Sequence, residues 1–365
     1  MIRVSHLIHS TGFGGVEIAA DYISHDAAGL EYRLLALRDD VPAAVRADCI
    51  GTGVNSLRSV AKVLSDLDQH PPEVLITSLW RSVLIGALHR FRHPRVPWVV
   101  FLHSTKYTHV LDRIAHRVAF KMADRILCDS AAAMKSLVPR ARWTHADVAR
   151  PDSALLKLSR ASDSTGRGIL RSTDRVRLIY WGRAAAEKRL DRTLVLLAVL
   201  ERLAPGRFEL DVISPHSPTL DTILFEATEQ NLSVSWKGHG TAEQILSRSV
   251  GASFFVQLSE FEGLGMAVRE ALSLGIIPVV TPVGEISTYT ADGVNAIHVD
   301  QSPTHEISST MYEDTARRIL ELAENKSAYA AMSRSARTVP DDDFITALET
   351  ALAKATETSI ERQES

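Results

Sequence analysis

The fold of this chain can be read outward from residues 252–275, which are ASFFVQLSEFEGLGMAVREALSLG. The stretch begins with a short apolar run over 252–257 and ends with apolar side chains at helical spacing over 264–274. This pattern predicts a buried strand, a loop that holds Glu262, and a helix that opens with the Gly-Leu-Gly of 263–265. Glu270 then falls in the second turn of that helix.

The same alternation of short apolar runs and helical spacing occupies nearly the whole chain. Strands are predicted over residues 2–9, 31–37, 73–79, 97–102, 125–128, 176–181, 207–213, 232–236, 252–257 and 276–281. Helices are predicted over residues 14–27, 56–67, 80–91, 109–122, 187–202, 217–229, 264–274 and 311–323. Such alternation implies crossover connections, and therefore α/β domains with parallel sheets that helices cover on both faces.

Chain length and one polar segment divide this pattern into two domains. The 365 residues are enough for two domains at about 150 residues each. Residues 158–175 are polar and rich in glycine, serine and arginine, which is typical of a linker. We predict a Rossmann-like N-terminal domain over 1–160, a linker over 161–175 and a Rossmann-like C-terminal domain over 176–340. A last helix, 343–358, is expected to pack back on the first domain.

Composition and charge narrow the class of protein. The chain is 45% apolar and 23% charged, an ordinary globular composition, and its net charge of −3 argues against nucleic-acid binding. Its two cysteines lack metal-ligand spacing, so we expect buried thiols in a reducing cytoplasm. No signal peptide is recognisable, and no run approaches the roughly 18 apolar residues that span a bilayer. We therefore expect a soluble or at most peripheral protein.

The start of the helix after Glu262 has the properties of an anion site. Free backbone N–H groups and the helix dipole attract phosphate there, and the glycines allow a ligand to approach the backbone. Glu262 and Glu270 would repel phosphate, so they suit hydroxyl groups instead. A nucleotide sugar offers phosphates to the amides and hydroxyls to the carboxylates. A capping acid and an exposed helix glutamate are the alternative.

The sequence resembles a known family, the family 4 retaining glycosyltransferases. Their Glu-x7-Glu signature is matched by EGLGMAVREAL at 262–272, and their Gly-Arg…Glu-Lys element by GRAAAEK at 182–188. The first Gly-rich loop, the histidine loop and the last N-domain strand are matched by TGFGGVE at 11–17, LHS at 102–104 and ADRILCDS at 123–130. The resemblance covers about residues 2 to 300. It implies the GT-B fold, in which two Rossmann-like domains face an interdomain cleft. The N-terminal domain, 1–160, would then be the acceptor domain, and the C-terminal domain, 176–340, the nucleotide-sugar donor domain.

The resemblance implies a role for each matching residue. Arg183 and Lys188 would bind the donor diphosphate, whose growing negative charge is the main electrostatic task of the reaction. They would replace a metal, so that no metal and no cofactor are expected. His103 and Glu262 would position the transferred sugar, and Glu270 would bind the ribose. The catalytic residues would be His103, Glu262, Arg183 and Lys188, and the donor-binding residues Gly14, Gly15, Arg183, Lys188, Gly263, Leu264, Gly265 and Glu270.

Retention would follow from front-face attack, with the leaving phosphate accepting the proton of the acceptor. A covalent mechanism through Glu262 is the alternative. The chain also departs from the family pattern. Ala267 stands where proline is usual, Arg189 and Glu285 stand where glycine is usual, and SPHSP at 214–218 replaces a Gly-x-Gly. The last departure leaves the nucleotide base unidentified.

The N-terminal half carries a local excess of positive charge. From Trp80 to His145 three acids, Asp112, Asp124 and Asp129, face twelve basic residues: Arg81, Arg90, Arg92, Arg95, Lys106, Arg113, Arg117, Lys121, Arg125, Lys135, Arg140 and Arg142. The helix over 109–122 is predicted to bury Leu111, Ile114, Ala115, Val118, Ala119 and Met122 and to expose Arg113, His116, Arg117 and Lys121. Such a face suits an anionic membrane or a lipid-phosphate acceptor. A solvated basic face on a core helix is the alternative.

Two further motifs are typical of other classes of protein. TGFGGV at 11–16 resembles a dinucleotide fingerprint followed by Asp39 and Asp40, but Glu17 occupies the third glycine position. DLD at 66–68 would indicate a metal-dependent transferase, but it ends a predicted helix instead of a strand. An NAD(P)-dependent dehydrogenase and a degenerate sugar-nucleotide-binding scaffold therefore remain the alternatives.

The prediction is a retaining, metal-independent hexosyltransferase that moves a sugar from a nucleotide-diphosphate sugar to a glycan, glycolipid or glycoconjugate acceptor. It is expected in the cytoplasm, in surface-polysaccharide assembly, with a peripheral contact to the inner face of the membrane.

Overall fold

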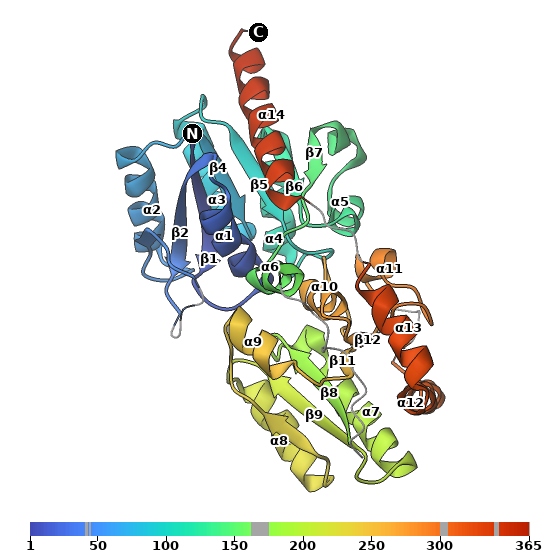
Figure 1. Cartoon of the computed structure of the whole chain (residues 1–365). Coiled ribbons are helices and arrows are strands. Elements are labelled where there is room, and N and C mark those ends of the chain that lie inside the picture. The colour runs from blue at the N-terminus through green and yellow to red at the C-terminus, as the bar shows by residue number, and fades with distance from the viewer. Residues whose placement is uncertain (41–42, 44, 162–174, 300–305, 339–342, 365) are drawn as a thin grey trace. The chain divides into compact units, whose positions relative to one another are not determined.

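The computed structural model describes residues 1–40, 43, 45–161, 175–299, 306–338 and 343–364 (Figure 1). The chain divides into two compact units, Met1–Ser153 with Asp342–Ser365, and Ala154–Asp341. Most of the predicted linker, residues 162–174, lies outside the described residues. The helix α6 (Ala154–Ala161) belongs to the second unit, although the sequence placed residues 1–160 in the first. Its Leu155 is buried in the same apolar cluster as Trp181 and Val268, which explains the assignment.

The first unit is built on a parallel sheet of seven strands in the order β3-β2-β1-β4-β5-β6-β7. The strands are β1 (Ile2–Ser10), β2 (Leu30–Arg38), β3 (Cys49–Ile50), β4 (Val74–Ser78), β5 (Trp98–Leu102), β6 (Arg125–Cys128) and β7 (Ala146–Val148). The helices are α1 (Gly15–Asp26), α2 (Leu57–Gln69), α3 (Trp80–Arg92), α4 (Val110–Met122), α5 (Ala131–Leu137), the 3-10 helix η1 (Arg140–His145) and α14 (Phe344–Glu364).

Helices cover both faces of this sheet, which is why its strands read as continuous apolar runs. In β5, Trp98, Val100 and Leu102 point into one buried cluster, and Val99 and Phe101 point into another. The second cluster is completed by α14, whose Phe344, Leu348 and Leu352 are buried there. The last helix of the chain is therefore part of the first unit's core (Figure 1).

The second unit is built on a parallel sheet of six strands in the order β10-β9-β8-β11-β12-β13. The strands are β8 (Val176–Trp181), β9 (Phe208–Ile213), β10 (Val234–Trp236), β11 (Phe254–Gln257), β12 (Ile277–Val280) and β13 (Ile297–His298). Its helices, besides α6, are the 3-10 helix η2 (Ala186–Lys188), α7 (Leu190–Leu203), α8 (Pro218–Glu229), α9 (Ala242–Arg248), α10 (Met266–Ser273), α11 (Ile286–Tyr289), α12 (Ser309–Glu324) and α13 (Lys326–Ala336).

Both sheets have the strand order of a Rossmann fold, which reverses between β1 and β4 in one unit and between β8 and β11 in the other. In such folds, ligands bind beyond the carboxyl ends of the strands at the point of reversal. The register of the second sheet sets Phe254 beside Leu178 and Phe208 beside Val176. The loops after β8 and β11 therefore leave the sheet side by side.

The predicted strands all occur, whereas β3, β7 and β13 were not predicted because two or three residues show no period. The predicted helix 187–202 begins later, at Leu190. Residues 186–188 form the turn η2, and Arg189 then adopts a left-handed φ of 48°. Glycine fits this conformation best, so an arginine here departs from the residue that the backbone favours. The Arg189 guanidinium is held by Asp191 at 2.9 Å and Glu306 at 3.1 Å.

Candidate functional site

The Gly-Leu-Gly stretch lies beyond the carboxyl end of β11, beside the reversal point of the second sheet. The helix α10 begins at Met266, later than the sequence predicted. Gly265 caps it in a left-handed conformation, with a φ of 73°. Residues 263–265, with Leu264 buried, therefore form a loop and a cap rather than the first helical turn.

Glu262 is held inside this loop by three side chains. Lys188 Nζ donates to its Oε1 at 2.7 Å and to its Oε2 at 2.9 Å. Gln257 Nε2 and Ser259 Oγ each donate to Oε1 at 2.7 Å. The glutamate side chain is 8% exposed and that of Lys188 is 21% exposed, so this is a largely buried ion pair. A buried carboxylate needs both an opposite charge and hydrogen bonds, and Glu262 has both.

Arg183 lies in a different environment from Lys188. It follows β8 after Gly182, and its side chain is 55% exposed, with Glu187 at 3.7 Å. Its carbonyl oxygen accepts a hydrogen bond from the Tyr180 hydroxyl at 2.7 Å. The sequence predicted that Arg183 and Lys188 both reach one anion. In the structure Lys188 pairs with Glu262, and the Arg183 side chain is largely exposed beside Glu187. That the two cations converge on one anion stays a prediction.

The second glutamate, Glu270, is buried in α10 and accepts a hydrogen bond from Trp181 Nε1 at 2.7 Å. Trp181 is the last residue of β8, so this bond joins the end of β8 to α10, the helix that follows β11.

The loop of residues 262–265 is fixed by the segment over 284–289. The Glu285 backbone N–H donates to the Gly263 carbonyl at 2.9 Å, and the Tyr289 hydroxyl lies 2.8 Å from the Leu264 carbonyl oxygen. A side chain at Gly284, whose φ is 60°, would collide with the Glu262 carbonyl oxygen.

A metal centre is not visible in the part of the chain that the structure describes. Among these residues no group of three or more histidine, cysteine, aspartate or glutamate side chains could hold a metal ion. The acids on which the alternative interpretations relied have protein partners. Asp66 and Asp68 pair with Arg33 and His93, and Asp39 accepts a hydrogen bond from Thr11.

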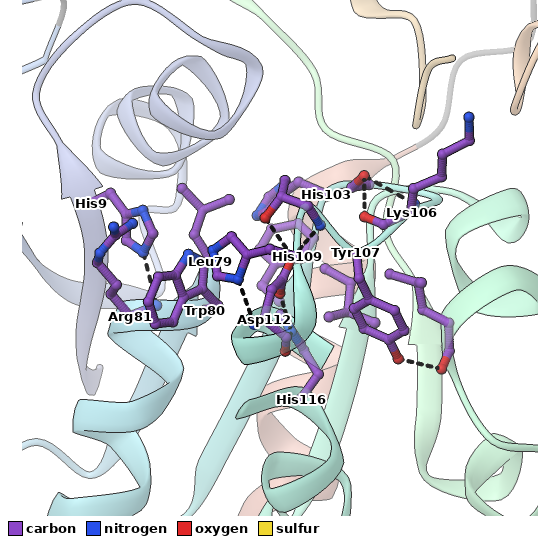
Figure 2. Close-up of a pocket in the computed structure, with 15 residues that line it drawn as sticks. His9, Leu79, Trp80, Arg81, His103, Lys106, Tyr107, His109, Asp112 and His116 are labelled. Carbon is purple, nitrogen blue, oxygen red and sulfur yellow. Dashed lines mark hydrogen bonds and ion pairs between the residues drawn. The ribbon is translucent and has the colours of Figure 1, made fainter. Parts of the chain in front are cut away.

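The first unit has a pocket of about 400 Å³, shown in Figure 2. The residues labelled there come from the carboxyl end of β1, from the start of α3, and from the segment between β5 and the first turns of α4. They are His9, Leu79, Trp80, Arg81, His103, Lys106, Tyr107, His109, Asp112 and His116. The pocket thus combines aromatic faces with hydrogen-bonding imidazoles, a combination that suits a sugar or another polyhydroxylated ligand.

Two histidines of this pocket, His9 and His103, are uncharged at neutral pH. Burial, reinforced by the neighbouring His6, lowers the pKa of His103 to about 3. Burial and the charge of Arg81 lower the pKa of His9 to about 4. His9 Nε2 accepts the Arg81 backbone N–H at 3.0 Å. Both rings therefore act as neutral hydrogen-bonding groups.

His103 is the pocket residue that the sequence predicted. Gly14 and Gly15 form the cap and first residue of α1, as predicted, and are not among the residues that line the pocket. No motif in the sequence marks Trp80, Tyr107 or His109 as pocket residues. Their signal is positional, because each lies within a few residues of a predicted strand end, where ligands bind. Leu79 adds a second signal in the structure, a left-handed φ of 69° at a non-glycine residue.

The predicted buried face of α4 is confirmed at Ala115 and Ala119 and is wrong at three of its larger apolar residues. Leu111 is 60% exposed, Ile114 is 49% exposed and Val118 is 38% exposed. The buried side chains are Asp112, Ala115, His116, Ala119 and Phe120. Polar groups enter this interior because His116 Nδ1 lies 2.8 Å from Asp112 Oδ1, and Thr108 donates two hydrogen bonds to the same carboxylate.

The exposed face of α4 is therefore both apolar and basic. We call it the α4 face: Val110, Leu111, Arg113, Ile114, Arg117, Val118 and Lys121. The neighbouring α3 also exposes Leu84, Leu88 and Phe91, at i, i+4 and i+7. Three of the twelve basic residues counted in this region are instead structural, since Arg90 and Arg125 pair with Asp124 and Asp147, and Arg142 donates to the Ala123 carbonyl.

The second half of the chain is similar in sequence to known glycosyl transferases. Residues 166–339 match the family model of glycosyl transferases group 1, slightly less than half of the chain. A curated relative is GDP-mannose:cellobiosyl-diphosphopolyprenol alpha-mannosyltransferase of Xanthomonas oryzae pv. oryzae. It is 31% identical over 114 residues, which are 29% of this chain and 28% of the relative. The match therefore spans little more than a quarter of that protein.

Solved structures resemble the chain over its full length. Anabaena HepE in complex with UDP-glucose has a TM-score of 0.71 at 16% identity, with 100% of both chains covered. Sucrose-phosphate synthase from Thermosynechococcus elongatus has a TM-score of 0.70 at 16% identity, covering 100% of this chain and 99% of that one. The chain has the GT-B fold. At these identities the likeness establishes the GT-B architecture alone.

The Lys188–Glu262 pair generates a testable prediction. Lys188→Ala leaves a buried carboxylate without its cation, so we expect the free energy of unfolding to fall by about 3 kcal/mol. Combining it with Glu262→Gln should recover part of the loss, because no unpaired charge then remains. Urea unfolding of the single and double variants measures the coupling.

Arg202→Ala is the matched control, because the Arg202–Glu313 pair joins two exposed side chains. We expect it to cost less than about 1 kcal/mol. Strictly additive effects of the Lys188 and Glu262 substitutions would contradict the assignment of the pair as one unit.

Proposed function

We propose that this protein is a glycosyltransferase that moves a sugar, of the hexose type, from a nucleotide-diphosphate sugar to a glycan, glycolipid or glycoconjugate acceptor. The observation that carries the proposal is the buried Lys188–Glu262 pair, at the reversal point of the second sheet and inside the segment that matches group 1 glycosyl transferases. The names of the mannosyltransferase relative and of the HepE complex with UDP-glucose support a nucleotide-sugar donor.

The cations of the site suit a leaving diphosphate. Arg183 presents an exposed guanidinium, which can form paired hydrogen bonds with phosphate oxygens, and Lys188 adds a fixed ammonium. Glu262 holds that ammonium through both of its oxygens. These two positive charges would stabilise the diphosphate as it leaves, a task that other enzymes give to a metal. We therefore propose a reaction that needs neither metal nor cofactor.

The environment of Glu262 favours front-face attack over a covalent intermediate. Its Oε1 accepts hydrogen bonds from Lys188, Gln257 and Ser259, which lowers the nucleophilicity of that oxygen. In the proposed reaction, the leaving phosphate takes the acceptor's proton and configuration is retained. Glu270, oriented by Trp181, would accept hydrogen bonds from the ribose, and the N–H groups around Gly263 and Gly265 would face phosphate.

The pocket of the first unit is proposed to receive sugar units, with His103 as a neutral hydrogen-bonding partner for a sugar hydroxyl. Trp80 and Tyr107 offer aromatic faces of the kind on which sugar rings pack. Arg81 and Lys106 line the same pocket, so a phosphate-bearing acceptor would also be accommodated.

We further propose that the α4 face contacts an anionic membrane from the cytoplasmic side. None of the described helices is long and apolar enough to cross a membrane. The α4 face instead sets exposed Leu111, Ile114 and Val118 beside Arg113, Arg117 and Lys121. Apolar side chains that enter the headgroup region, flanked by cations that attract anionic lipid, are typical of a surface-bound helix. A glycolipid acceptor would be reached from this position.

A thermal-shift panel of nucleoside diphosphates and nucleotide sugars in EDTA tests the proposed function. A ligand at 100 times its dissociation constant should stabilise the wild type by about 2.7 kcal/mol. Arg183→Ala combined with Lys188→Ala should abolish the shift, because the phosphate partners are removed. Arg202→Ala, a control on the same domain, should keep it. Absence of any shift in the wild type would instead favour a degenerate scaffold, and a shift with NAD(H) alone would favour a dehydrogenase.

Sedimentation with vesicles of phosphatidylcholine, with and without phosphatidylglycerol, tests the membrane contact. Binding should require the anionic lipid and weaken with salt. Changing Arg113, Arg117 and Lys121 to Gln should reduce the affinity on the order of a hundredfold, at about 1 kcal/mol for each charge. Serine at Leu111, Ile114 and Val118 should reduce binding at every salt concentration. Indifference to both lipid charge and salt would refute the contact.

A further inference from the structure

A chain of hydrogen bonds runs through the core of the first unit and ends at His103. The Tyr32 hydroxyl lies 2.7 Å from His6 Nδ1, His6 Nε2 lies 2.8 Å from Ser78 Oγ, and Ser78 Oγ lies 3.0 Å from His103 Nε2. Its members come from the adjacent strands β2, β1 and β4 and from the residue after β5. Chains of this kind polarise and orient the groups at their ends.

We propose that this chain is a positioning device, in which Tyr32, His6 and Ser78 hold His103 as the tautomer that carries its proton on Nδ1. The neutral ring then offers a fixed N–H donor to the sugar in the pocket. The inference rests on the proposed function for the identity of that ligand, but the tautomer itself does not depend on it.

Counting protons shows why the chain selects a tautomer. Each hydroxyl has one proton, and each neutral imidazole has one protonated and one bare nitrogen. If Tyr32 donates to His6 Nδ1, the His6 proton is on Nε2 and is donated to Ser78. The Ser78 hydroxyl then donates to His103 Nε2, so the His103 proton must be on Nδ1. The reverse polarity would move both protons. In either polarity, as long as the Ser78 hydroxyl donates to one of the two rings, the histidines carry their protons on opposite nitrogens.

Because these groups are buried, each of them has to find its hydrogen-bond partner within the protein. His6 and Ser78 have no exposed surface, so no solvent molecule replaces a missing partner at these positions. An unsatisfied buried polar atom costs about 1–3 kcal/mol, which disfavours any arrangement that breaks the chain. Burial also lowers the pKa of His6 and of His103 to about 3, so both rings stay neutral at physiological pH.

Two features favour the polarity that runs from Tyr32 to His103. A phenol is a better hydrogen-bond donor to an imidazole nitrogen than an acceptor from it, because its proton is the more acidic. At the other end, the Asp129 Oδ2 atom lies 4.0 Å from His103 Nδ1. This distance is too long for a hydrogen bond, but the negative charge favours a proton on the nitrogen that faces it.

The test is the ¹⁵N chemical shifts of the ring nitrogens in protein labelled at histidine, with His103 assigned through His103→Gln. In the wild type, His6 should be protonated on Nε2 and His103 on Nδ1. Tyr32→Phe removes the donor that sets the polarity, so the ratio of Nε2–H to Nδ1–H at His103 should rise about fivefold, the equivalent of one net hydrogen bond. In a Ser78→Ala background the same substitution should have no effect on His103, because the link is gone.

Tyr22→Phe is the matched control. Tyr22 and Tyr32 pack against the same apolar cluster, but the Tyr22 hydroxyl is not a member of the hydrogen-bond chain, so this substitution should leave the tautomer ratio of His103 unchanged. Protons on the same nitrogen in both histidines, or a His103 shift indifferent to Tyr32→Phe, would overturn the inference.

A second measurement separates this inference from the proposed function. Tyr32→Phe should lower kcat for sugar transfer while nucleoside diphosphate binding, which uses the second unit, stays at its wild-type strength. If the wild type binds no nucleotide, the proposed function fails. The ¹⁵N chemical shifts still test whether the hydrogen-bond chain sets the tautomer of His103.

Discussion

Every strand pairing that the structure describes in the two sheets is parallel, and this constraint places both the pocket of the first unit and the Lys188–Glu262 site of the second. Parallel strands deliver the loops that follow them to one edge of the sheet. In the first unit, that edge collects His9, Ser78 and His103. In the second unit, it collects Arg183 and Glu262. The strands themselves are buried on both faces by helices, so side chains that bind a ligand are confined to the ends.

At the second edge, one ion pair organises the loop. Glu262 joins Lys188, 74 positions earlier, to the end of β11 through Gln257. The left-handed turns at Gly265 and Gly284 make room for this arrangement, since a side chain at either position would meet a neighbouring group. A carboxylate held in this way is suited to fix a cation near a phosphate. It is less suited to attack a sugar.

Much of the fold follows from the sequence, because buried parallel strands are continuous apolar runs and their crossover helices show a clear period. The Lys188–Glu262 contact does not follow, since no local pattern reports a pairing between distant loops. Part of the buried face of α4 was predicted wrongly, because the spacing of apolar residues does not show that His116 and Asp112 pair with each other in the protein interior. The hydrogen-bond chain from Tyr32 to His103 does not follow from the sequence either, because its members lie on four different segments.

We propose above all that the site transfers a sugar with retention and without a metal. The most direct test follows the reaction by ¹H NMR in EDTA. The donor is a nucleotide sugar, the acceptor is water or a simple alcohol, and the signal observed is the anomeric proton of the sugar product. The account predicts that the first sugar product has the anomeric configuration of the donor and that added Mg²⁺ or Mn²⁺ does not change the rate. A product of opposite configuration, or turnover that appears only with metal, would contradict it.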